Sequence, residues 1–202
     1  STQYVFSFQD GDGHNKKLLG GKGANLSEMT QIGLNVPPGF VISTEACLAY
    51  LASPERAIPD GLLDSVRAQI IQLEKSTGKG FGDPDNPLLL SVRSGSAVSM
   101  PGMMDTILNL GLNSATLAGL IKQTDNERFG YDAYRRFIQL FGKVALGIAD
   151  EKFDKPFDEL KKREGVKADV GLNAEHLREI SEVFLDVVRQ ETGRPFPDDV
   201  FE

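Results

Sequence analysis

The stretch Leu88-Leu89-Leu90-Ser91-Val92-Arg93-Ser94-Gly95, followed closely by Met100-Pro101-Gly102-Met103-Met104-Asp105-Thr106, is the most informative part of this 202-residue chain. An apolar run ends on an arginine, and a loop of Ser, Gly and Pro follows. The loop leads into a second apolar run, Ile107-Leu108-Asn109-Leu110-Gly111. The pattern predicts two strands, over residues 88–92 and 107–110, that are joined by a polar loop.

The arginine and the loop after it suit a phosphate ligand, because a guanidinium matches phosphate oxygens with several parallel donors. The loop offers hydroxyl and amide donors, and Thr106 adds a hydroxyl where the second strand begins. Two alternatives stay open for Arg93, which either extends to solvent or pairs with a carboxylate such as Asp105. The methionines of the loop, Met104 among them, either line an apolar slot for a flat base or fill the core.

A second glycine-rich stretch, Gly20-Gly21-Lys22-Gly23, lies some seventy residues upstream. It is not a Walker A loop, because the spacing fails and no Ser or Thr follows the lysine. We expect a helix to start near residue 21 and to place Lys22 in its first turn, where backbone N–H groups and the helix dipole favour anions. The stretch is either a phosphate clamp or a glycine-rich turn with an exposed lysine.

The remaining patterns predict an α/β (α+β) fold class. Residues 1–112 alternate short apolar runs with helical patterns, with strands expected over 4–8 and 40–42 and helices that start near 44 and 60. After residue 113 almost every pattern is helical, with helices expected near 116–121, 129–144, 152–162 and 174–190. We therefore expect an α/β subdomain with the phosphate loops over 1–112, and a mainly helical subdomain over 113–202 that is cut before the rest of its domain.

The composition disfavours several classes of protein. The chain has 22 Lys and Arg against 29 Asp and Glu, a net charge of −7, and so lacks the basic surface typical of nucleic-acid-binding proteins. No apolar run approaches the ~20 residues of a membrane span, and the first residues show no secretory signal. The single cysteine, Cys47, is expected to be a small buried side chain in a reducing, cytoplasmic compartment.

The segment Tyr131-Asp132-Ala133-Tyr134-Arg135-Arg136-Phe137 places two arginines on one helix. Adjacent helical residues project about 100° apart, so at most one of the arginines points straight at a given ligand. The default expectation for the pair is a solvated face. The two histidines have no metal-ligand spacing, and no convincing pair of carboxylates is found, so no metal site is predicted in this chain.

Five motifs follow one another along the chain: Gly20-Gly21-Lys22-Gly23-x-Asn25-Leu26, Pro37-Pro38-Gly39-Phe40, Ser91-Val92-Arg93-Ser94-Gly95, the run over 100–111 and Tyr131-Asp132-x-Tyr134-Arg135-Arg136-Phe137. Together they resemble the motifs of the pyruvate, phosphate dikinase family. The most specific is Met-Pro-Gly-Met-Met-Asp-Thr, because the related phosphoenolpyruvate synthases carry a different sequence between the strand arginine and the threonine. The resemblance covers essentially the whole chain.

The resemblance implies an N-terminal nucleotide-binding domain of ATP-grasp type. It implies that Lys22 and Arg93 hold ATP phosphates and that Thr106 donates a hydrogen bond to a phosphate oxygen. The second arginine of the helix motif, Arg136, is implied as the catalytic residue that helps to bind phosphate groups during transfer. The full cofactor-binding set expected for ATP is Lys22, Arg93, Met104, Asp105 and Thr106.

The same resemblance implies the reaction of ATP, phosphate and pyruvate to AMP, diphosphate and phosphoenolpyruvate. ATP would phosphorylate a histidine on a separate swivelling domain, and a barrel would bind pyruvate. The Mg²⁺ ligands, the phosphohistidine and the barrel are expected outside this chain, and the parent enzyme is expected to be a homodimer. This chain would hold half of an ATP site and would be inactive alone. Two alternatives remain: a stand-alone phosphate-ligand or protein-binding module, and a fragment of a sister dikinase such as phosphoenolpyruvate synthase.

Overall fold

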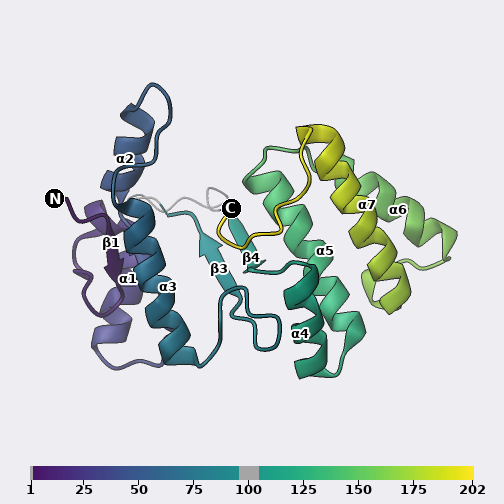
Figure 1. Cartoon of the computed structure of the whole chain (residues 1–202), viewed down its shortest axis with the longest axis horizontal. Helices are drawn as coiled ribbons and strands as arrows, with labels where there is room; N and C mark the ends of the chain where they lie inside the picture. The colour runs from purple at the N-terminus through teal and green to yellow at the C-terminus, as the bar shows by residue number, and fades with distance from the viewer. Residues whose placement is uncertain (1, 96–104) are drawn as a thin grey trace. The chain divides into compact units, whose positions relative to one another are not determined.

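The computed structural model describes residues 2–95 and 105–202. These residues form seven α-helices, one 3-10 helix and two small antiparallel sheets, which confirms the predicted α/β (α+β) class (Figure 1). The chain divides into two compact units. Of the described residues, the first unit contains 2–78 with 94 and 95, and the second contains 79–93 with 105–202.

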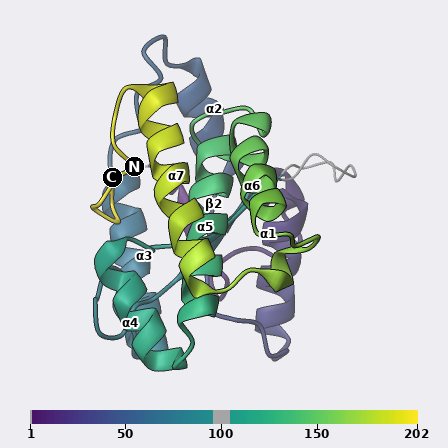
Figure 2. The ribbon, with the colours of Figure 1, turned by 90° about the vertical axis from the view of Figure 1, so that its right-hand side faces the viewer.

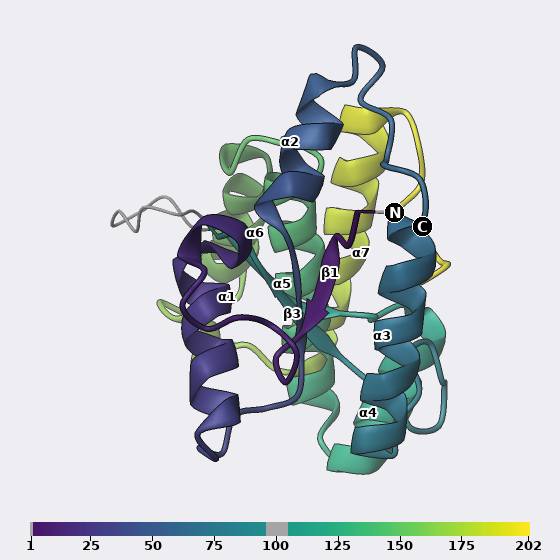
Figure 3. The same cartoon turned by 90° about the vertical axis from the view of Figure 1, so that its left-hand side faces the viewer.

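The first unit combines a two-stranded sheet with three helices. Strand β1 (Val5–Ser7) pairs antiparallel with β2 (Phe40–Ile42), so that Phe6 lies opposite Val41. Both strands lie where the sequence predicted them. In Figure 3, β1 lies between α1 and α3, and α3 contacts β1. The three helices are α1 (Lys16–Gln31), α2 (Thr44–Ala52) and α3 (Leu62–Thr77).

Helix α2 starts as predicted but buries little of its apolar surface. The Ser43 hydroxyl oxygen accepts a hydrogen bond from the Ala46 amide at 3.3 Å, which caps the helix. Ala46 is the one buried residue of α2, whereas Leu48 is 63% exposed. Cys47 is exposed, so the prediction that it is buried is wrong. The apolar neighbours Leu48 and Tyr50 were misleading, because both are exposed as well.

The second unit has a larger core, built mainly on α5 and α7. Its sixteen buried core residues include Phe153, Ile138 and Phe184, none of which is exposed to solvent. Figure 2 shows α5, α6 and α7 side by side, and α7 packs along α5 and α6. The elements are β3 (Leu90–Arg93), β4 (Thr106–Leu110), α4 (Ser114–Thr124), α5 (Glu127–Val144), α6 (Glu151–Arg163), η1 (Asp169–Gly171) and α7 (Ala174–Thr192).

Two capping boxes fix where helices of the second unit begin. The Asn113 side chain accepts a hydrogen bond from the Thr116 amide, while the Thr116 hydroxyl accepts one from the Asn113 amide. Asn173 and His176 make the same reciprocal pair at the start of α7. Such pairs satisfy amides that have no partner inside the helix. These pairs set the starts of α4 and α7, and the four helices α4 to α7 all lie close to their predicted positions.

The β3–β4 hairpin is grouped with the helices that follow it. Strands β3 and β4 belong to the second unit, because β4 packs on α5. The Ile107 side chain is buried in the same core as α5 and α7. The packing thus groups this hairpin with the helices, while an α/β subdomain over 1–112 and a helical subdomain over 113–202 stay a prediction.

We predict that Phe184→Ala lowers the free energy of unfolding of the second unit by about 3–5 kcal/mol. The Phe184 ring is fully buried and meets the Phe153 ring edge-on at a centroid distance of 5.1 Å. Urea unfolding followed by circular dichroism measures the change. Val170 is 84% exposed, so Val170→Ala is a control expected to stay within about 0.5 kcal/mol. Equal losses for both variants would contradict this assignment of the core.

Candidate functional site

The β3–β4 hairpin brings together two residues that the sequence placed in one site. Strands β3 and β4 are both labelled in Figure 1. They pair antiparallel, with Arg93 directly opposite Thr106 and Val92 opposite Ile107. Directly opposed residues of an antiparallel pair project to the same face and lie close to one another. A guanidinium and a hydroxyl therefore stand together at the two ends of the segment 94–105.

The surroundings of this pair fit a site that is open to solvent. Arg93 is exposed, and its Nε lies 3.5 Å from the Ser91 hydroxyl oxygen. Thr106 is half-buried and Asp105 is exposed. An exposed Arg93 agrees both with a phosphate-binding role and with a side chain that extends to solvent, so its role stays a prediction. Met104, together with the rest of segment 96–104, lies outside the described residues.

Asp105 lies within electrostatic reach of the C-terminal end of α5. The pKa of Lys143 is raised above its ordinary value, first because the ammonium donates a hydrogen bond to Asp150 at 2.5 Å. The Asp105 carboxylate adds a smaller upward contribution. Arg136 precedes Lys143 by seven residues, about two turns, so both start from one face of α5. Strand β4, which begins directly after Asp105, also packs on α5, so Asp105 adjoins an element that is in contact with this helix.

In the first unit, the glycine-rich stretch interrupts a helix. Helix α1 begins at Lys16, earlier than predicted, but Gly20 has φ 70° and ψ 163°, a conformation that is essentially restricted to glycine. The helix resumes at the next residue, so Lys22 lies in a first turn as expected. Lys22 itself is half-buried. The error in the start arose because Asn15 caps a short extra turn, where its side chain accepts a hydrogen bond from the Leu18 amide.

Thr44 contacts the backbone of α1 at this interruption. Its hydroxyl lies 2.6 Å from the carbonyl oxygen of Lys17 and 3.2 Å from that of Leu18. A hydroxyl has one hydrogen, so Thr44 donates to one of these carbonyl oxygens at a time, and Lys17 is the nearer acceptor. In an uninterrupted helix these carbonyls would accept from the amides of Gly21 and Lys22. Sequence reasoning missed this contact, because it joins residues that are 27 positions apart.

Of the two arginines on α5, Arg135 is buried and Arg136 is exposed. Nη2 of Arg135 lies 2.8 Å from Asp132 Oδ1 and 2.8 Å from Asp169 Oδ2, and the guanidinium stacks over the Phe157 ring. Arg136 has 54% of its side chain exposed, and its Nη2 lies 3.0 Å from Asp132 Oδ2. The expectation of a solvated face is therefore wrong for Arg135, which Phe157 of α6 and Asp169 of η1 cover.

The sequence held a signal for one of these carboxylates and none for the other. Asp132 precedes the arginines by three and four residues, the spacing at which helical side chains meet. Asp169 is 34 residues from Arg135, and only the folded structure brings the two together.

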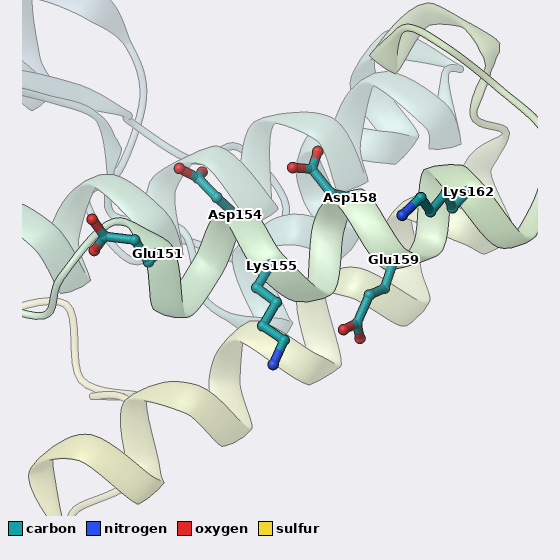
Figure 4. Close-up of a pocket in the computed structure, with 6 residues that line it drawn as sticks. All are labelled: Glu151, Asp154, Lys155, Asp158, Glu159 and Lys162. Carbon is teal, nitrogen blue, oxygen red and sulfur yellow. The ribbon is translucent and has the colours of Figure 1, made fainter.

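A shallow hollow on the outer face of α6 does not resemble a phosphate site. Figure 4 shows the six charged side chains that project from the helix around it. Four are carboxylates and two are ammonium groups, so the hollow is negative overall and would repel a phosphate. The six residues are Glu151, Asp154, Lys155, Asp158, Glu159 and Lys162.

The described residues contain neither a cluster of metal ligands nor a helix suited to span a membrane. Over residues 2–95 and 105–202, no three side chains of His, Cys, Asp or Glu are arranged to hold a metal ion. In the same part of the chain, no helix combines the length and the apolar character needed to cross a membrane.

We predict that Gly20→Ala destabilises α1 by about 1–3 kcal/mol, because a Cβ is strained at this φ and ψ. Amide hydrogen exchange of residues 16–31 measures the loss of protection. Lys16→Ala changes an exposed side chain of the same helix and is expected to stay within about 0.5 kcal/mol. Unchanged exchange in Gly20→Ala would mean that the backbone at Gly20 is not held in this conformation.

Residues 16–61, which include α1, β2, α2 and Lys22, match the family model described as pyruvate phosphate dikinase, AMP/ATP-binding domain. The chain is 54% identical over 199 residues to the pyruvate, phosphate dikinase of Entamoeba histolytica. It is 47% identical over 199 residues to the chloroplastic pyruvate, phosphate dikinase 1 of Arabidopsis thaliana, and 45% identical over 197 residues to the pyruvate, phosphate dikinase of Clostridium symbiosum. These matches cover 98%, 96% and 97% of this chain, and 22%, 20% and 22% of the relatives. The chain thus spans about a fifth of their length. Identity at this level over almost all of its residues places the chain in the pyruvate, phosphate dikinase family.

Proposed function

We propose that this chain is part of the ATP-binding domain of a pyruvate, phosphate dikinase and that it holds phosphate groups of ATP. The observation that carries the proposal is the cross-strand pair of Arg93 and Thr106, which frames the segment 94–105. The match of residues 16–61 to an AMP/ATP-binding domain supports it independently. In a chain with a net charge of −7, an anionic ligand needs local cations of this kind.

Arg93 and Thr106 have complementary tasks in this proposal. The Arg93 guanidinium supplies charge and up to five donors, and the Thr106 hydroxyl donates one hydrogen bond to a phosphate oxygen. Asp105 carries a negative charge and only accepts hydrogen bonds, so its contact with ATP would be to a ribose hydroxyl or to the base. Met104 would offer the base an apolar surface.

Lys22 is proposed to hold a phosphate from the first unit. Its position in the first turn after Gly20 combines an ammonium with backbone amides and the positive end of the helix dipole. A lysine alone would be unfavourable at that end of a helix, and a bound anion compensates for this. Thr44 supports the arrangement, because its hydroxyl donates a hydrogen bond to a backbone carbonyl oxygen at the interruption.

Arg136 is proposed as the catalytic residue. Phosphoryl transfer depends mainly on cations that are positioned around a dispersing negative charge. Arg135 is buried against Asp169 and Phe157, which leaves Arg136 as the arginine of the pair that a ligand can reach. Arg136 would bind phosphate oxygens while the group is transferred.

The whole enzyme is proposed to convert ATP, phosphate and pyruvate to AMP, diphosphate and phosphoenolpyruvate, as the names of the relatives suggest. ATP would phosphorylate a histidine on another domain, and a barrel domain would bind pyruvate. Because this chain spans about a fifth of its relatives, we expect it to bind ATP weakly and to catalyse nothing alone. We further propose a homodimeric, cytoplasmic parent enzyme.

Mg²⁺ enters the proposal only as the ion that accompanies ATP in solution. The described residues offer no cluster of metal ligands, so no step is assigned to a metal ion held by this chain. The residues proposed above act on the phosphates directly, through charge and hydrogen bonds.

We predict that the double variant Lys22→Ala, Arg93→Ala binds Mg-ATP at least about tenfold more weakly than the wild type, because charge-assisted hydrogen bonds contribute about 1.5–3 kcal/mol each. Isothermal titration calorimetry measures both dissociation constants. Lys155→Ala, Arg178→Ala is a matched control that removes the same two charges at exposed positions on α6 and α7.

If both double variants bound Mg-ATP equally more weakly than the wild type, the loss of affinity would come from the change in net charge and not from these two positions. Equal binding by the wild type and Lys22→Ala, Arg93→Ala would overturn the roles given to these residues and favour a stand-alone module.

A further inference from the structure

The Asp132 carboxylate lies between two arginines of α5 that have different surroundings. Its Oδ1 is 2.8 Å from Nη2 of Arg135, and its Oδ2 is 3.0 Å from Nη2 of Arg136. Only 17% of the Asp132 side chain is exposed, against 4% for Arg135 and 54% for Arg136. One carboxylate thus connects a buried cation to an exposed one.

Arg135, the buried arginine beside Asp132, has further contacts to α6 and η1. The Arg135 guanidinium is hydrogen-bonded to Asp169 of η1 at 2.8 Å and lies 4.4 Å from the ring centroid of Phe157 of α6. Arg128 of α5 also reaches η1, where its Nη2 donates to the Asp169 carbonyl at 2.8 Å. Arg135 cannot move without breaking these contacts, and its charge, 2.8 Å from Oδ1, attracts the Asp132 carboxylate as an ion pair.

We propose that Asp132 is a positioning residue that orients the Arg136 guanidinium for phosphate. The inference rests on the proposed function, in which Arg136 binds phosphate during transfer. An exposed arginine samples many rotamers and loses that freedom when it binds a ligand. Asp132 limits the rotamers beforehand through Oδ2, while the other guanidinium donors of Arg136 stay available to phosphate.

The proposal makes a prediction opposite in sign to simple electrostatics. Asp132→Asn removes a negative charge beside a proposed phosphate site, which by Coulomb attraction alone would strengthen the binding of ATP. If Asp132 positions Arg136, the same change weakens binding, because an amide holds a guanidinium less firmly than a carboxylate does. The sign of the change therefore separates the two explanations.

A double-mutant cycle with Arg136→Ala tests the proposal in this 202-residue chain. We expect Asp132→Asn to raise the dissociation constant for Mg-ATP about three- to tenfold when Arg136 is present, and less than about twofold in the Arg136→Ala background. Asp186→Asn is the matched control, since Asp186 pairs with Arg189 on α7 at 2.7 Å and is expected to leave binding unchanged.

Two results of the cycle would overturn the proposal. Equal weakening in both backgrounds would make Asp132 a merely structural residue, and tighter binding by Asp132→Asn would make its effect electrostatic. Asp132→Glu covers the case in which Asp132→Asn fails to fold. It keeps the charge but lengthens the side chain, so it should retain the fold and still weaken binding when Arg136 is present.

A measurement without nucleotide separates this inference from the proposed function. The ¹⁵N heteronuclear NOE of the Arg136 Nε–Hε group reports how ordered the side chain is. We expect it to fall in Asp132→Asn and to stay unchanged in Asp186→Asn. If the wild type fails to bind Mg-ATP while this NOE falls, the proposed function is wrong and the positioning of Arg136 stands. An unchanged NOE overturns the positioning of Arg136 by Asp132.

Discussion

The antiparallel pairing of β3 and β4 is the interaction on which the proposed site depends. It converts a separation of thirteen positions in sequence into a direct cross-strand pair of Arg93 and Thr106. The pairing also anchors the hairpin, because Ile107 on β4 is buried in the core that α5 and α7 build. A shift of the register by one residue would move Thr106 to the opposite face of the hairpin and separate the hydroxyl from the guanidinium.

The two units give their candidate residues different kinds of support. In the second unit, Arg93, Thr106 and Arg136 stand on elements that pack on a large aromatic core. In the first unit, Lys22 depends on a backbone interruption at Gly20 and on the hydroxyl of Thr44, beside a much smaller core. The position of Lys22 therefore rests on local backbone geometry, whereas the core of the second unit anchors the elements that carry the other three residues.

Local patterns in the sequence predicted the helices and strands well, but they predicted poorly which side chains are buried or in contact. The apolar periodicity of residues 129–144 and 174–190 located α5 and α7, because each helix buries one continuous stripe. Burial of Cys47 and exposure of Arg135 were both predicted wrongly, since each depends on contacts made by distant segments. The order of strand, loop and strand indicated a hairpin, but local reasoning could not predict that Arg93 lies directly opposite Thr106. The interruption at Gly20 could be suspected from the glycines, but its carbonyl partner Thr44 could not.

The most direct test of the central claim follows ¹⁵N chemical shifts of the chain during titration with ATP, inorganic diphosphate and adenosine. If the ends of segment 94–105 bind phosphate, then ATP and diphosphate shift the Thr106 amide and the Arg93 Nε–Hε signals, and adenosine leaves both unchanged. The account would be contradicted if adenosine shifted these two signals as strongly as ATP. It would also be contradicted if the shifts caused by ATP were confined to other surfaces, such as the charged face of α6.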